Sequence, residues 1–144
     1  MFMTSATMPH SGPRLRALHV TLWIAQVLLF AFFLMAGFNH GLRPIAEAAK
    51  GSPWITDIPV PLARFIGLAE LAGAVGVVLP AATRVKPWLT PLAAAGLAAI
   101  MTLAVPFHVM RGEARVVAFN IVPMLLAIFV AWGRWKRAPI APRS

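Results

Sequence analysis

Residues 18–38 have the sequence LHVTLWIAQVLLFAFFLMAGF, which contains no Lys, Arg, Asp or Glu. A helix needs about 20 apolar residues to cross a hydrocarbon core of about 30 Å. This stretch of 21 residues therefore predicts a membrane-spanning helix. Arg14 and Arg16 precede it as they would precede a signal peptide, but the apolar run is longer than a usual signal-peptide core and Met35-Ala36-Gly37 is a poor cleavage site.

Three further apolar stretches follow, at residues 62–79, 88–109 and 116–132. Within them the formally charged residues are Arg64 and Glu70. Only 12% of the chain is charged and 60% is hydrophobic, whereas about 25% of a typical soluble domain is charged. The sequence predicts a single all-α integral membrane domain over residues 1–144, an antiparallel bundle of four transmembrane helices with flexible tails at 1–13 and 137–144.

The basic residues predict the orientation of the bundle. Eight of the 13 Lys and Arg residues lie in the two tails and in the loop at 80–87, and five lie on the opposite side. Cytoplasmic loops carry the excess of Lys and Arg, so we expect a multi-pass protein of the bacterial inner (plasma) membrane with both termini cytoplasmic. The net charge of +9 does not indicate nucleic acid binding, because the basic residues lie in short tracts between apolar runs and form no soluble basic face. The lipid bilayer is the expected partner.

The long loop at 39–61 predicts a short interfacial helix. Residues 44–50 (PIAEAAK) place a proline at the first turn, where its missing N–H costs nothing. We expect this helix to lie along the outer interface as a lid. Trp54 and Ile55 after it would either enter lipid or cap the bundle.

Small residues in the second and third stretches predict close helix contacts, because helices in lipid associate where small side chains let their backbones approach. Ala63, Gly67, Glu70 and Ala74 share one face of the second helix. The third stretch contains five alanines and a glycine within residues 93–99. Both sets are expected to face the bundle interior.

Glu70 lies at the middle of its apolar stretch, where a carboxylate costs about 2.5–3.5 kcal/mol on insertion scales. At a rise of about 1.5 Å per residue, the predicted helix ends place Gln26 within about one turn of Glu70 in depth. The sequence therefore predicts a hydrogen bond between these two side chains. Glu70 would either lock two helices together or belong to a ligand or proton site.

The other polar residues of the predicted helices gather in the outer half of the membrane. Arg64 is about 9 Å from Glu70 along the helix axis, too far for direct contact without a ligand or water. Their grouping predicts a cavity that opens outward beneath the lid. The candidate ligand-binding residues are Gln26, Asn39, His40, Arg64, Glu70, His108 and Asn120.

The sequence indicates no metal centre. It has no cysteine, no zinc-ligand spacing and no pair of Glu and Glu-x-x-His motifs of the di-iron type. A b-type haem between His40 and His108 is the remaining alternative, although an isolated histidine at a helix end is more often an interfacial hydrogen-bonding group. Catalytic residues stay unassigned.

Five segments together resemble the DoxX-like family of small bacterial four-helix membrane proteins. They are FLMAGFNHGL (33–42), RFIGLAELAGAVG (64–76), PAATR (80–84), the alanine-rich third stretch ending in His108, and NIVP (120–123). The resemblance covers residues 15–135, and its most specific part is Gly-x-x-Glu-x-x-Gly at 67–73. The first helix of the family often ends in Gly followed by Lys, and His40 stands near that place here.

The resemblance implies a role beside an oxidoreductase, because family members are similar to a subunit of a thiosulfate-to-quinone oxidoreductase. A membrane subunit or accessory of this kind would bind quinone or a small lipid-like ligand near Glu70 and His108. It would leave the redox chemistry to a membrane or periplasmic partner or to the quinone itself. The alternative is a non-catalytic membrane factor that stabilises or assembles partner proteins. Enzymatic activity and oligomeric state stay open.

Overall fold

The computed structural model describes residues 12–144, so most of the expected tail at 1–13 lies outside the described residues. The elements are α1 (Pro13–Gly41), α2 (Ile45–Gly51), the 3-10 helix η1 (Pro53–Asp57), α3 (Val60–Thr83), α4 (Leu89–Met110), α5 (Ala114–Trp132) and a π-helical extension η2 (Gly133–Arg137). Within this part of the chain, four helices are long and apolar enough to cross a membrane: α1, α3, α4 and α5 with η2. Each contains one predicted span, so the fold class is confirmed.

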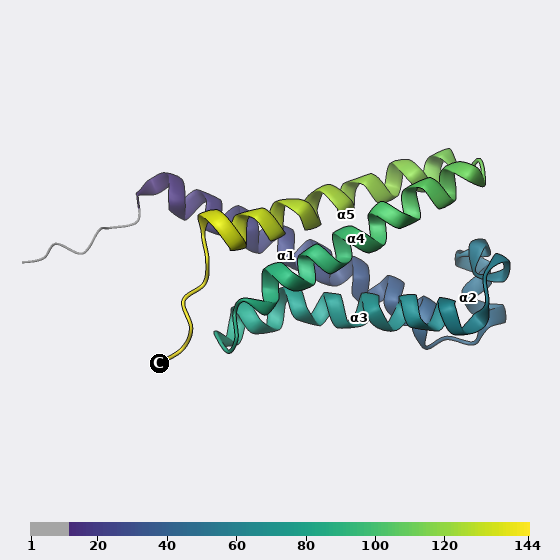
Figure 1. Cartoon of the computed structure of the whole chain (residues 1–144), viewed down its shortest axis with the longest axis horizontal. Coiled ribbons are helices and arrows are strands. Elements are labelled where there is room, and N and C mark those ends of the chain that lie inside the picture. The colour runs from purple at the N-terminus through teal and green to yellow at the C-terminus, as the bar shows by residue number, and fades with distance from the viewer. Residues whose placement is uncertain (1–11) are drawn as a thin grey trace, which may run out of the picture.

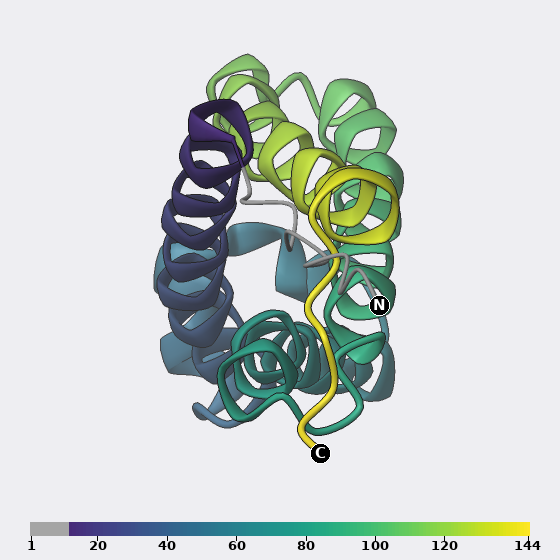
Figure 2. The same cartoon turned by 90° about the vertical axis from the view of Figure 1, so that its left-hand side faces the viewer.

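The four long helices pack as two antiparallel pairs, α1 with α3 and α4 with α5 (Figure 1). The pairs approach each other where α1 begins and α5 ends, and they separate toward the α2 end, as Figures 1 and 2 show. We call α2 and η1, residues 45–57, the lid, and we call the opposite end of the bundle the basic end. The described chain ends therefore lie on the same side, opposite the lid.

The core between the two pairs is apolar. It is formed by buried side chains from all four helices: Leu22, Leu29, Phe33, Val77, Leu97, Met101, Ala127 and Val130. The outward faces are apolar too, since Phe65 is 68% exposed and Leu103 is 74% exposed. An apolar exterior of this kind suits a lipid environment, because the outward side chains then contact hydrocarbon, where the helices satisfy their backbone hydrogen bonds internally.

Glycines bring α1 and α3 into backbone contact. Gly37 and Gly41 of α1 lie against Gly67 of α3, and a Cβ atom added to Gly67 would overlap backbone atoms of Gly41. Ala63 and Ala74, which share this face of α3, are fully buried. The expectation that the small face of α3 points into the bundle is confirmed.

The corresponding expectation for α4 is wrong for half of its small residues. Ala94 and Leu97 are buried, but Ala95, Gly96 and Ala99 face outward. The physical reason is the helical period: residues that follow one another directly in sequence must spread around the helix, so only those three or four apart share the interior face. Small size alone does not select a face.

The carboxyl-terminal segment runs back along the turn between α3 and α4. The backbone N–H of Arg143 donates to the Arg84 carbonyl at 2.9 Å, and Nε of Arg84 donates to the Ala141 carbonyl at 3.1 Å. The stretch expected as a flexible tail at 137–144 is thus hydrogen-bonded to Arg84 near its end. These contacts keep several basic residues together at the basic end.

Candidate functional site

A cavity of about 1130 Å³ lies between the two helix pairs under the lid. All four long helices and the lid contribute to its wall, which is largely apolar. Met35 of α1, Phe65 of α3, Leu103 of α4 and Phe119 of α5 line the cavity and are all more than half exposed. The cavity lining therefore continues onto the lipid-facing surface, both between α1 and α5 and between α3 and α4.

The lid is held by its own small core. Ala48 and Ile55 are buried against Ala63 at the start of α3. This places the Trp54 ring over the cavity, with its centroid 5.0 Å from that of His40 and 6.3 Å from that of His108. Of the two expectations for these lid side chains, capping of the bundle is confirmed.

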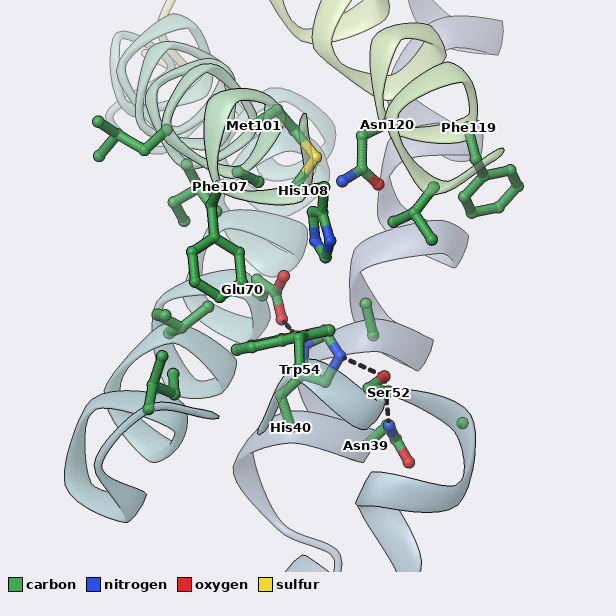
Figure 3. Close-up of a pocket in the computed structure, with 18 of the residues that line it drawn as sticks. Asn39, His40, Ser52, Trp54, Glu70, Met101, Phe107, His108, Phe119 and Asn120 are labelled. Atoms are coloured by element: carbon green, nitrogen blue, oxygen red, sulfur yellow. Dashed lines mark hydrogen bonds and ion pairs between the residues drawn. The ribbon is translucent and has the colours of Figure 1, made fainter. Parts of the chain in front are cut away.

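Glu70 is paired with His40 inside the cavity wall. Glu70 is only 3% exposed, and its Oε2 lies 2.7 Å from Nδ1 of His40. The other imidazole nitrogen, Nε2, lies 3.0 Å from Oγ of Ser52 in the lid. Asn39 donates to the same Oγ at 3.2 Å (Figure 3). The buried carboxylate is thus connected to the lid through one histidine.

The predicted bond between Gln26 and Glu70 is wrong. Gln26 lies toward the basic end, where its Nε2 donates to the Val77 carbonyl at 2.5 Å and its Oε1 accepts from Nε of Arg134 at 2.7 Å. Arg64 does not pair with Glu70 either, as its position along α3 predicts: its guanidinium donates to the His40 carbonyl at 3.2 Å. Gln26 does not line the cavity and is therefore not part of the candidate site.

A second histidine and carboxylate pair lies on the opposite wall. Nδ1 of His108 is 2.5 Å from Oε2 of Glu113, and Arg111 donates to the other oxygen of Glu113 at 3.0 Å. Hydrogen bonds from Arg111 and His108 lower the pKa of Glu113 to about 2. Because the ionised carboxylate only accepts, Nδ1 of His108 carries the proton and Nε2 stays available to a ligand. Arg111 also forms an ion pair with Asp57, which ties the lid to this wall.

Asn120 of α5 completes the polar part of the cavity. Its side chain is beside His108 in Figure 3 and is only 8% exposed. Its amide atoms are not among the fully buried side-chain atoms that lack a hydrogen-bond partner in residues 12–144, so they are open to the cavity. An accessible amide on a cavity wall can donate to or accept from a ligand.

The model of the DoxX-like family matches residues 24–130. The chain belongs to the DoxX-like family. No curated protein and no solved structure matches it. The matched range contains the lid and all of the polar cavity side chains described above, so the resemblance noted in the sequence is confirmed over the part of this DoxX-like chain that forms the cavity.

Five of the seven sequence candidates line the cavity, namely Asn39, His40, Glu70, His108 and Asn120. Arg64 lies next to it through its bond to His40. Ser52 and Glu113 also line the cavity and were not predicted. Glu113 follows His108 by five residues across a tight turn, which is a usable signal, whereas nothing around Ser52 in the sequence distinguishes it from an ordinary loop serine.

Two kinds of metal group can be compared with the donors of the DoxX-like cavity, a bound ion and a haem. Among the described residues, no group of three or more His, Asp or Glu side chains could hold a metal ion. A haem with two histidine ligands needs one free nitrogen from each imidazole. Both nitrogens of His40 are engaged, by Glu70 and Ser52, so His108 is the histidine of the pair with a free nitrogen.

Proposed function

We propose that this DoxX-like membrane protein binds a small lipid-like molecule of the quinone class in the cavity under the lid. It would do so as a membrane subunit or accessory of an oxidoreductase system. The observation that carries the proposal is an apolar cavity of about 1130 Å³ that continues onto the lipid-facing surface and has polar groups under the lid. Pockets for small organic ligands typically measure about 300–1,000 Å³ and combine apolar walls with a few placed polar groups.

The polar groups support a position for the head of the ligand. The Asn120 amide can donate to one carbonyl oxygen of a quinone, and Nε2 of His108, which accepts in the neutral ring, can take a hydrogen bond from a hydroxyl of the reduced quinol. The His40–Glu70 pair faces the head from α1 and α3, where it can accept or deliver a proton. The isoprenoid tail would leave between α1 and α5, past Met35 and Phe119.

A partner supplies the electrons in this proposal. Reduction of a quinone to a quinol takes two electrons and two protons, and this chain contains no cysteine thiol to carry electrons. We infer a membrane or periplasmic oxidoreductase as the electron donor or acceptor. The chain itself contributes binding, orientation and proton transfer.

The charge distribution supports an orientation in the bacterial inner membrane with both termini in the cytoplasm. The Asp and Glu residues number four, Glu47, Asp57, Glu70 and Glu113, and all belong to the lid side of the bundle. The basic end carries the larger group of Lys and Arg residues, which favours the cytoplasmic face. A reporter fused after residue 144 tests this, because a signal from outside the cell would contradict it.

Ligand binding is tested directly on the purified protein. Trp54 is one of five tryptophans and caps the cavity, so titration with a short-chain quinone should quench the wild-type fluorescence more than that of Trp54→Phe. Replacing Asn120 with leucine should weaken quinone binding about tenfold, and replacing His108 with leucine should weaken quinol binding about tenfold, each the equivalent of one hydrogen bond of about 1.4 kcal/mol. Thr102→Ala, on an exposed position of α4, is the matched control and should bind normally.

Extraction of copurified lipids from mild detergent provides the second measurement. Quinone should be present in the wild-type extract and depleted in the Asn120→Leu and His108→Leu extracts. Equal affinity and equal quinone content in all of these proteins would contradict the proposal. That result would favour the alternative role, in which the bundle stabilises or assembles partner proteins without a ligand.

A further inference from the structure

Three side chains from distant parts of the chain form a continuous hydrogen-bonded relay on the cavity wall. Ser52 lies between α2 and η1, His40 lies at the end of α1, and Glu70 lies at the middle of α3. The Oγ atom of Ser52 is 3.0 Å from Nε2 of His40, and Nδ1 of His40 is 2.7 Å from Oε2 of Glu70 (Figure 3). All three line the cavity.

Hydrogen-bonding rules fix the direction of this relay. An ionised Glu70 only accepts, so Nδ1–H of His40 donates to its carboxylate, and Nε2 of the neutral ring is then an acceptor. The Ser52 hydroxyl must donate to Nε2. The Asn39 amide, which donates to Oγ of Ser52, occupies a remaining lone pair of that oxygen. Each group therefore has the role that it has in a nucleophile, base and carboxylate triad, and both distances fall within hydrogen-bond reach.

We propose that Ser52 is a nucleophile that takes the acyl group from carboxylic esters whose chains enter the cavity from the bilayer, with His40 as the base and Glu70 as its orienting carboxylate. The inference rests on the proposed function in one respect, namely that a lipid-like molecule occupies the cavity. The apolar wall below the relay, which includes Phe32, Ile66 and Met101, would hold the acyl chain.

The reaction balances without any redox partner. Oγ of Ser52 attacks the ester carbonyl carbon while its proton passes to Nε2 of His40. The Asn39 amide, 3.2 Å from Oγ, would transfer its N–H hydrogen bond from that atom to the neighbouring oxygen that becomes negative. The bond to the leaving alcohol breaks, and that alcohol takes the proton from His40. Water then attacks the acyl-serine with His40 again as base, which releases a carboxylic acid and restores Ser52.

The burial of the relay supports catalysis over simple lid attachment. The side chains of His40 and Glu70 are only 12% and 4% exposed. Water is therefore largely kept away from the pair, which strengthens its electrostatic interactions and limits competing proton exchange. Attachment of the lid needs no buried carboxylate behind the histidine, since Asn39 already bonds to Ser52 and to the Ala48 carbonyl.

The absence of cysteine from the sequence permits a sharp test of the relay that needs no ester and no ligand in the cavity. Ser52→Cys introduces a single thiol in place of the hydroxyl, and its alkylation by iodoacetamide is followed against pH. We expect the midpoint of the rate profile to fall at least about one pH unit below 8.5, the usual thiol value, because His40 stabilises the thiolate. Adding His40→Gln should restore the usual midpoint. Thr56→Cys, in the same lid but outside the cavity lining, is the control and should titrate normally.

The second test uses the wild-type protein in detergent. A fluorophosphonate probe should label Ser52, and Ser52→Ala or His40→Gln should reduce labelling and hydrolysis of a medium-chain p-nitrophenyl ester at least tenfold. Thr56→Ala should retain both. Helical circular dichroism and thermal unfolding show separately that each variant is folded, and quinone binding by the wild-type protein shows separately whether the cavity takes a lipid-like ligand. A folded protein without labelling, or a normal midpoint for the thiol at position 52, would overturn the proposal and leave Ser52 as a lid attachment only.

Discussion

Replacing Gly67 with alanine tests the contact that joins α1 to α3. The added Cβ would overlap backbone atoms of Gly41 and stand 2.6 Å from the carbonyl carbon of His40. Backbone atoms cannot rotate away as a side chain can, so the two helices must move apart. Overpacking of this kind costs about 1–3 kcal/mol and more where it is not relieved, while alanine returns up to about 1 kcal/mol through its helix propensity. We expect a net loss of about 2 kcal/mol or more.

The measurement is thermal unfolding in mild detergent, followed by helical circular dichroism. A loss of about 2 kcal/mol lowers Tm by about 4–8 °C in a chain of this size. The matched control is Gly96→Ala on α4, where no described atom lies within 4 Å of the added Cβ. Its Tm should be equal to or above the wild-type value, because only the propensity gain remains. Equal melting temperatures for the two variants would refute the argument that Gly67 holds the helices in backbone contact.

Three further predictions concern the charged groups. The folded pKa of Glu113 is lowered from 4.5 to about 2, so its contribution to stability is present above pH 4.5 and is lost as pH falls toward 2. The Tm difference between wild type and Glu113→Gln should therefore be constant near neutral pH and should shrink as the pH falls from 4.5 to about 2. Arg111→Gln removes the ion pair between the lid and the α4–α5 turn, and we expect Trp54 emission to shift to longer wavelength. The change in Tm should be small, since partly exposed ion pairs are worth about 1 kcal/mol or less. An unchanged emission spectrum would show that this ion pair is not needed to hold the lid. Gln26→Leu removes the acceptor that lies 2.7 Å from Nε of the buried Arg134 guanidinium, which should destabilise the bundle by about 1–3 kcal/mol. The Gln26→Leu, Arg134→Leu double variant should recover part of that loss in the same unfolding assay. Additive effects of the two substitutions would contradict the coupling.

The sequence predicts the four spans and the lid helix because the bilayer imposes simple rules on both. A segment in lipid must satisfy all of its backbone hydrogen bonds internally, so a long apolar run is a helix. The proline at residue 44 and the following alanines predict α2 by the same local chemistry. The outward-facing alanines of α4 escaped prediction, because composition says that a helix has small residues without saying which of them face a neighbour.

The membership of the cavity was largely predictable, but its hydrogen bonds were not. Polar side chains inside a membrane avoid lipid, so grouping Asn39, His40, Glu70, His108 and Asn120 in one cavity follows from their common depth. Their partners depend on loops, whose paths hydropathy does not describe. Ser52 reaches His40 only because the lid folds back over the bundle. Glu113 reaches His108 because Gly112, with φ of 71°, reverses the chain within one turn.

The wrong pairing of Gln26 with Glu70 has a single cause, the register of α1 against α3. The predicted helix ends assume that residues 38 and 62 lie at the same depth, which would set Gly41 level with residue 59. Gly41 instead lies against Gly67, eight residues further along α3, a displacement of about 12 Å. This shift carries Gln26 away from Glu70 and brings His40 level with it. An apolar helix satisfies hydropathy equally well at depths two turns apart, whereas backbone contact between glycines fixes one register. The same contact therefore also places the imidazole of His40 against the buried carboxylate.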